Sequence, residues 1–211
     1  MKKYIISIFI IIAIIIFAIF FIFNRSNNYT NTDNISASRT STESKNDLSE
    51  NINNTTYNDF SQAKEISSYA TEIKDNSPGR LTNINITCSV LNNTIVLPGQ
   101  TFSFNEVVGQ PTAERGYQEA SVIINHKTEK GIGGGNCQVS STLYNAVLAV
   151  PTLSVVERHE HGKDVAYVPE GKDAAVSYGS LDLKFINNSE KSIMINSATD
   201  NSSITIKLLE L

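Results

Sequence analysis

The chain has 211 residues, 40% of them hydrophobic, and a formal net charge of −4. It contains no basic stripe with interleaved aromatic residues, so no nucleic-acid partner is expected. Its two cysteines allow at most one internal disulfide.

The N-terminal residues carry the pattern of a membrane anchor. Residues 4–23 are an uninterrupted apolar run without a charge, and a helix of that length spans roughly 30 Å, the thickness of a bilayer's hydrocarbon core. Lys2 and Lys3 precede the run and only Arg25 follows it closely, which predicts a cytoplasmic N-terminus and an exported remainder. A cleaved signal peptide is the alternative, but it usually has a shorter apolar region and a small-x-small cleavage site, which this sequence lacks. We therefore expect residues 1–23 to be a single-pass anchor in the cell membrane.

The rest of the chain divides into a spacer and a domain. Residues 24–60 are rich in Asn, Ser and Thr, and their few apolar side chains cannot offset the entropy cost of ordering. They predict a disordered stalk. Residues 61–211 are long enough for one extracellular domain with its own core.

The first predicted element of the domain is a helix over residues 81–92. Four residues recur at helical spacing on one face: Leu81, Ile84, Cys88 and Leu91. Free cysteine is among the most buried residue types, so we expect Cys88 to be a small core residue. A disulfide between Cys88 and Cys137 is the alternative.

Strand signals follow. Residues 94–97 are β-rich and end at the turn formed by Pro98 and Gly99, while residues 101–105 alternate in polarity as a strand does. Residues 117–125 predict another strand.

The glycine-rich residues 131–135 then lead into a predicted helix over residues 137–150, which Pro151 terminates. Apolar residues recur along it at helical spacing: Val139, Leu143, Ala146, Val147 and Val150. Residues 153–161 alternate like a strand, and residues 181–211 predict an antiparallel meander. The expected fold is α+β, with a mostly antiparallel sheet packed against two or three helices.

Cys137 stands at the start of that helix, directly after the glycines. Free N–H groups and the positive end of the helix dipole favour an anion there, either a thiolate or the oxyanion of a tetrahedral intermediate. Glycines allow a substrate chain to approach the backbone closely. A phosphate-binding loop is excluded because no Lys-Ser/Thr follows. The pattern leaves a nucleophile and a structural thiol equally open.

A nucleophilic thiol needs a base, and the segment "ERHEH" offers two. His159 and His161 are expected to share one face of a strand with Glu157, and either ring suits proton transfer from Cys137. Asp173, Asp164 or Glu157 is a candidate to orient the imidazole. His126 has no partner in its segment and is expected at the surface.

Two other interpretations of the histidine pair remain. Zinc suits an H-x-H pair with a carboxylate, and would recruit Cys137, but zinc motifs usually show a second tight ligand cluster. No metal or cofactor is therefore expected. A pair of structural polar strand residues is the other interpretation.

Several segments resemble the VanW domain, in order and at similar spacing over roughly residues 80–200: "LPGQTFSFNEVVG", "GGGNCQVSSTLYNAVL", "ERHEHGKDVAYVPEGKDAAV" and "LDLKFINN". This family is named after an accessory protein of glycopeptide-resistance clusters, and some of its members are similar to cysteine-dependent L,D-transpeptidases. The resemblance implies that Cys137 is the nucleophile, with motif histidines at positions 159 and 161 and the glycine-rich lead at Gly133, Gly134 and Gly135. Asn136 and Gly162 depart from the residues common in the family.

The resulting hypothesis is an anchored cell-wall enzyme, an L,D-transpeptidase or carboxypeptidase whose partner is the peptidoglycan stem peptide. Gln138, Ser140 and Ser141 fall in the first helical turn, where they either bind substrate or cap the turn. Two alternatives stay open: a non-catalytic module that binds peptidoglycan stems or a glycopeptide in the same groove and is linked to vancomycin resistance, and a zinc-dependent amidase.

Overall fold

The computed structural model describes residues 63–124 and 127–211. The predicted anchor and stalk, residues 1–60, lie outside the described residues, as does His126. Within the described ranges, no helix is both long enough and apolar enough to cross a membrane.

The largest sheet has four strands, all of them antiparallel. In sheet order they are β1 (Lys64–Glu72), β9 (Ser203–Glu210), β8 (Ile193–Thr199) and β2 (Thr94–Val96). Ile204, Ile206 and Leu208 alternate along β9 and are fully buried, so one face of this sheet forms the floor of the core. The pairing of β8 with β9 confirms the hairpin predicted at the C-terminus, whereas β1 was not predicted.

A second, three-stranded sheet has the order β3 (Thr101–Ser103), β7 (Lys184–Asn187) and β6 (Leu153–Glu157). The prediction of one meander over residues 181–211 is wrong at its first strand, because β7 lies in this sheet and not beside β8. Both edges of β7 are occupied by β3 and β6, which leaves none for β8.

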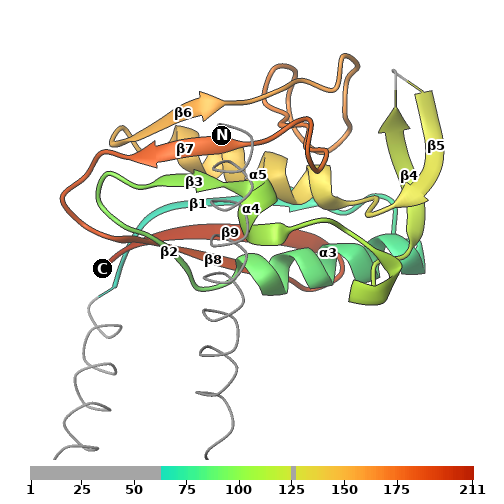
Figure 1. Ribbon diagram of the computed structural model, residues 1–211, viewed down its shortest axis with the longest axis horizontal. Coiled ribbons are helices and arrows are strands. Elements are labelled where there is room, and N and C mark those ends of the chain that lie inside the picture. The colour runs from blue at the N-terminus through green and yellow to red at the C-terminus, as the bar shows by residue number, and fades with distance from the viewer. Residues whose placement is uncertain (1–62, 125–126) are drawn as a thin grey trace, which may run out of the picture. The chain divides into compact units, whose positions relative to one another are not determined.

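Two long helices pack against the four-stranded sheet. Helix α3 (Pro78–Leu91) packs on β8, and α5 (Asn136–Leu148) packs on β1 and β9, with the two helices in contact. Helix α5 also contacts β6, so it is sandwiched between the sheets (Figure 1). With α4 (Phe104–Val108) and the 3₁₀ turn η1 (Ala113–Arg115), the described residues confirm the α+β prediction.

The predicted core faces of both helices are buried. In α5, Val139, Leu143 and Ala146 are fully enclosed. In α3, Cys88 is 2% exposed, and both cysteines are free, so the core prediction for Cys88 is confirmed and the disulfide alternative is not observed. Burial raises the pKa of the Cys88 thiol to about 11.

Two predicted strands extend beyond the strands in the structure. The strand expected over residues 101–105 ends at Ser103, whose hydroxyl accepts a hydrogen bond from the Glu106 N–H at 3.1 Å and starts α4. The strand expected over residues 153–161 ends at Glu157, after a register irregularity between Val155 and Glu157. The histidines therefore follow the strand and do not share its face with Glu157.

A two-stranded hairpin projects beside the start of α5 (Figure 1). It consists of β4 (Glu119–Ile124), which confirms the strand predicted at residues 117–125, and β5 (Lys127–Ile132). The second strand escaped prediction because most of its side chains are charged or polar and exposed. It delivers the chain directly to the glycines that precede α5.

Candidate functional site

The glycines before α5 allow the protein's own chain to pack closely. A Cβ on Gly134 would lie 2.5 Å from the carbonyl oxygen of Ser121 in β4. Gly135 has φ +118°, and a Cβ there would lie 2.9 Å from the Ile84 side chain in α3. The glycines thus set the start of α5 against both α3 and β4, and Gly133, Gly134 and Gly135 also line the adjoining cavity.

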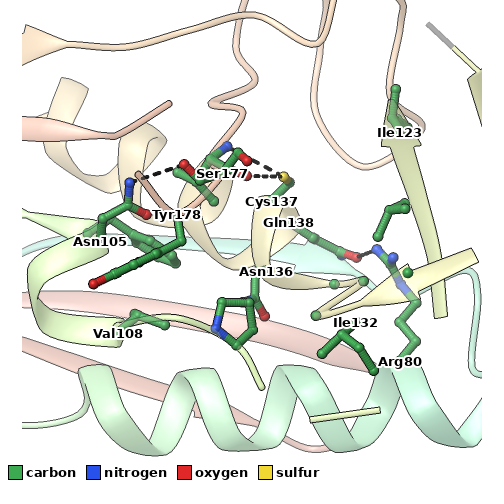
Figure 2. Close-up of a pocket in the computed structure, with 18 of the residues that line it drawn as sticks. Arg80, Asn105, Val108, Ile123, Ile132, Asn136, Cys137, Gln138, Ser177 and Tyr178 are labelled. Atoms are coloured by element: carbon green, nitrogen blue, oxygen red, sulfur yellow. Dashed lines mark hydrogen bonds between the residues drawn. The ribbon is translucent and has the colours of Figure 1, made fainter. Parts of the chain in front are cut away.

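Cys137 occupies the first turn of α5 and is half-buried. Its Sγ lies 3.4 Å from the Val176 carbonyl oxygen and 3.5 Å from the Val176 nitrogen. Dashed lines mark hydrogen bonds of the Cys137 sulfur in Figure 2. The sulfur is therefore held at the junction between α5 and the segment that follows Asp173.

The backbone donors of this turn are only partly used. The N–H groups of Gln138 and Val139 both donate to the Gly135 carbonyl, at 3.0 and 3.3 Å. Within the described ranges, the N–H groups of Gly135 and Cys137 have no hydrogen-bond acceptor. The Gly134 N–H also has none in this part of the chain, so several backbone donors at the start of α5 are available to an oxyanion.

His161 lies between Cys137 and Asp173. Its Nδ1 is 2.5 Å from Asp173 Oδ2, and its side chain is only 4% exposed. Cys137 lies near enough to the ring to influence its protonation. Burial opposes protonation, yet the interactions with Cys137 and with Asp173 together raise the pKa of His161 above its usual range.

Asp173 is a buried carboxylate that accepts hydrogen bonds from His161 and Arg158. Its Oδ2 accepts the backbone N–H of His161 at 2.8 Å, and its Oδ1 accepts Arg158 Nη2 at 2.8 Å. Burial opposes ionisation, but the hydrogen bonds from the His161 ring and backbone, with the charges of His161 and Arg158, hold the pKa of Asp173 below its usual range. Such a carboxylate orients the ring and stabilises its charged form.

His159 has a different environment. Its Nε2 lies 3.0 Å from Glu157 Oε1, its side chain is 38% exposed, and it does not line the cavity beside Cys137. The Lys184 ammonium, followed by His159, lowers the pKa of Glu157 to about 2. Because the two histidine rings bind different carboxylates, they do not form the joint pair that the zinc hypothesis required. No cluster of three or more metal-binding side chains occurs in residues 63–124 and 127–211.

Ser140 and Ser141 are fully buried on the inner side of α5. The Ser141 hydroxyl accepts the Ala174 N–H at 2.9 Å and donates to the Cys137 carbonyl at 2.7 Å. The Ser140 hydroxyl donates to the Ala174 carbonyl at 2.6 Å. The two serines therefore fasten the segment after Asp173 to the turn that carries Cys137.

A cavity of about 440 Å³ opens over the sulfur. Figure 2 shows Asn105 and Tyr178 on one side of Cys137 and Arg80 on the other. His161 and Gln138 line the same cavity. Of the predicted site residues, the structure thus brings together Cys137, His161, Asp173, Gln138 and the glycines; His159 lies apart, and the two serines lie beneath.

Sequence reasoning missed Tyr167 and Arg80. Burial and the nearby Cys137 raise the pKa of the Tyr167 hydroxyl, and Tyr167 lines the same cavity as Cys137. Arg80 donates from Nη2 to Gln138 Oε1 at 2.7 Å. Tyr167 follows His161 closely in the chain, so its position in the histidine segment was a signal that the sequence offered. Arg80 is far from Cys137 in the chain and carried no local signal.

Comparisons with known proteins agree with the resemblance. A family model described as "VanW like protein" matches residues 79–209. The chain is 39% identical over 145 residues to the uncharacterized protein YoaR of Bacillus subtilis, covering 69% of this chain and 48% of the relative. It is 32% identical over 115 residues to the vancomycin B-type resistance protein VanW of Enterococcus faecalis, covering 51% of this chain and 41% of the relative. In both comparisons, the matched part is less than half of the relative's length. No solved structure matches.

Proposed function

The chain belongs to the VanW family, and on that premise we propose that its domain is a cysteine-dependent L,D-transpeptidase-like enzyme acting on peptidoglycan stem peptides. The observation that carries the proposal is that His161, hydrogen-bonded to the Asp173 carboxylate, lines the same cavity as Cys137 and interacts with it. This is the nucleophile, base and orienting group of a covalent acyl-transfer site.

In the first half-reaction, the Cys137 thiolate attacks the carbonyl carbon of the stem-peptide bond that follows the diamino acid. The thiol proton is held by His161, whose charged ring Asp173 stabilises. The backbone N–H groups of Gly135 and Cys137 stabilise the oxyanion. The C–N bond then breaks, the leaving amine of the terminal D-residue takes the proton from His161, and a thioester remains on Cys137.

In the second half-reaction, an amine from a neighbouring stem attacks the thioester carbonyl. His161 accepts a proton from that amine, the C–S bond breaks and the thiolate is restored. Water in place of the amine gives a carboxypeptidase. One peptide bond is exchanged for another, so no nucleotide is required, which suits an exported domain. The predicted anchor in residues 1–23 and stalk in residues 24–60 are part of this proposal.

The test is to incubate the full-length chain with purified disaccharide-tetrapeptides and to read the products by mass. We expect cross-linked dimers or shortened stems, together with a Cys137 adduct equal to the stem minus its terminal residue. The products should vanish in Cys137→Ala and persist in Cys88→Ala. Unchanged substrate with the wild-type chain would contradict the enzymatic proposal.

The second candidate is a non-catalytic module that binds stem peptides or a glycopeptide. One observation favours it: the Cys137 thiol already donates a hydrogen bond to the Val176 carbonyl, as a structural thiol does. In that case Cys137→Ala should bind the same peptides with unchanged affinity, and no thioester should form with any of them.

A further inference from the structure

Arg80 borders the start of α5 through its contact with Gln138 and forms no ion pair among the described residues. The hydrogen bonds from Ser77 and, after them, the charge of Arg80 lower the pKa of Asp75, so this carboxylate is near Arg80 without being paired to it. Among the described residues, no carboxylate lies within ion-pair distance of its guanidinium. Its Nη2 binds Gln138, its Nε is buried without any acceptor, and its Nη1 has no acceptor in the described ranges but is not enclosed. A partly desolvated guanidinium with unused donors binds an anion strongly.

Gln138 holds that guanidinium in place. Its Nε2 donates to the Glu72 carbonyl at 2.8 Å and to the Thr71 hydroxyl at 3.2 Å, so its Oε1 faces Arg80. This chain of contacts fixes a positive charge in the wall of the cavity that Cys137 also lines. Figure 2 shows Gln138 and Arg80 joined on the side of Cys137 away from Asn105.

Arg80 also stands where two cavities meet. A second cavity, of about 320 Å³, shares Arg80, Gln138 and Tyr167 with the cavity over Cys137. Burial and then Cys137 raise the pKa of the Tyr167 hydroxyl, while Arg80 lowers it, so this hydroxyl lies near both residues. A ligand that occupies the cavity over Cys137 therefore meets Arg80 in the wall of that cavity.

We propose that Arg80 binds a carboxylate of the peptide substrate at the wall shared by the two cavities. This rests on the proposed function, because the peptide is the stem that Cys137 attacks. A carboxylate meets the free Nη1 and the outer edge of the guanidinium, and Gln138 keeps that edge directed into the cavity. Arg80 is thereby a specificity-determining residue that sets which bond reaches the sulfur.

Two carboxylates flank the bond that is attacked and have this chemistry: the terminal one, on the leaving residue, and the one on the side chain of a diaminopimelate-type residue. The experiment separates them with three tetrapeptides, one with both carboxylates free, one amidated at the C-terminus and one amidated on the side chain. Binding is measured by calorimetry on the full-length chain carrying Cys137→Ala, which prevents turnover.

We expect the free peptide to bind about tenfold or more tightly than one of the two amidated peptides, as the loss of a charge-assisted hydrogen bond predicts. In the Arg80→Gln background this ratio should fall to near one, and in Arg80→Lys it should be partly restored. Lys74→Gln is the matched control, because Lys74 lines only the second cavity, and it should leave the ratio unchanged. The ratio compares peptides on the same variant, so a general loss of stability does not mimic the effect.

Equal affinity for all three peptides, binding of none of them, or the same ratio with and without Arg80 would each overturn the proposal. The proposed enzyme activity is judged separately on the wild-type chain. A carboxylate preference that depends on Arg80, without a thioester on Cys137, would support this inference and refute catalysis.

Discussion

Cys88 and Cys137 carry the same thiol in two environments, and the difference is one of burial and contacts. Cys88 is enclosed in the core between α3 and β8, with a pKa of about 11. Cys137 is half-buried, lines a cavity and contacts a histidine. Only the second environment suits a nucleophile.

The first prediction concerns alkylation. With iodoacetamide near neutral pH, we expect Cys137 to react at least about tenfold faster than Cys88, because a thiol with a high pKa and no solvent contact is rarely an accessible thiolate. Peptide mass analysis over time gives both rates. Cys88→Ala should leave the Cys137 rate unchanged. Slow and equal labelling of the two residues would argue for a structural Cys137.

The second prediction concerns the protonation of His161. An NMR titration should give a pKa for His161 above its ordinary value of about 6.5, and Cys137→Ala or Asp173→Asn should lower it, because each removes a partner of the charged ring. A folded-state pKa above that of the unfolded chain stabilises the fold fully below about pH 6.5, and this contribution is lost as the pH rises through the folded-state value. Cys88→Ala is the control, and a pKa of His161 at or below about 6.5 would contradict the assignment.

At the scale of the secondary-structure elements, the glycines at positions 133–135, which join β5 to α5, determine how closely α5 can lie against β4. The composition alone suggested that these glycines make room for a substrate chain. In the structure, Gly134 makes room for the Ser121 carbonyl and the Ala120 side chain of β4. Gly134 therefore allows α5 and β4 to pack closely, and this packing sets the position of the Cys137 sulfur.

The third prediction follows from this contact. Gly134→Ala should lower the free energy of unfolding by about 1–3 kcal/mol, the usual cost of overpacking. It should also change the Cys137 alkylation rate, because α5 and β4 must move apart. Urea denaturation and the alkylation assay measure the two effects.

The control for that substitution is Gly99→Ala. Gly99 has φ +74°, and nothing lies within 4 Å of an added Cβ. Gly99→Ala should lower the free energy of unfolding by about 1 kcal/mol, because alanine is strained in the left-handed region, and should leave the Cys137 alkylation rate unchanged. Equal thiol reactivity in Gly134→Ala and the wild type would show that the junction does not position the sulfur.

At the scale of the whole molecule, β1 completes the fold although it precedes the family match at residues 79–209. It pairs with β9 along its length, the Ser67 hydroxyl donates to the Ala146 carbonyl at 2.7 Å, and the hydroxyls of Thr71 and Thr142 are 2.8 Å apart. Without β1, one side of α5 and one edge of β9 would be exposed.

The fourth prediction is that a chain of residues 61–211 unfolds cooperatively, whereas residues 79–211 do not. Removing β1 exposes buried apolar surface and unpairs a central strand, which together exceed the margin by which a domain of this size is stable. Chemical denaturation followed by near-ultraviolet circular dichroism distinguishes the two. A cooperative transition in the shorter chain would show that β1 is dispensable.

The sequence by itself determined the helices at Cys88 and Cys137, the buried face of each, the C-terminal hairpin and the α+β class. Local periodicity and turn residues report these directly, because each depends on neighbours within a few positions. Tertiary structure alone decided that His161 and not His159 meets Cys137, that Asp173 supports it, and that Arg80 borders the same cavity. Periodicity shows which face of an element is buried but not what covers it, and the partners here come from segments that only the packing of the sheets around α5 brings together.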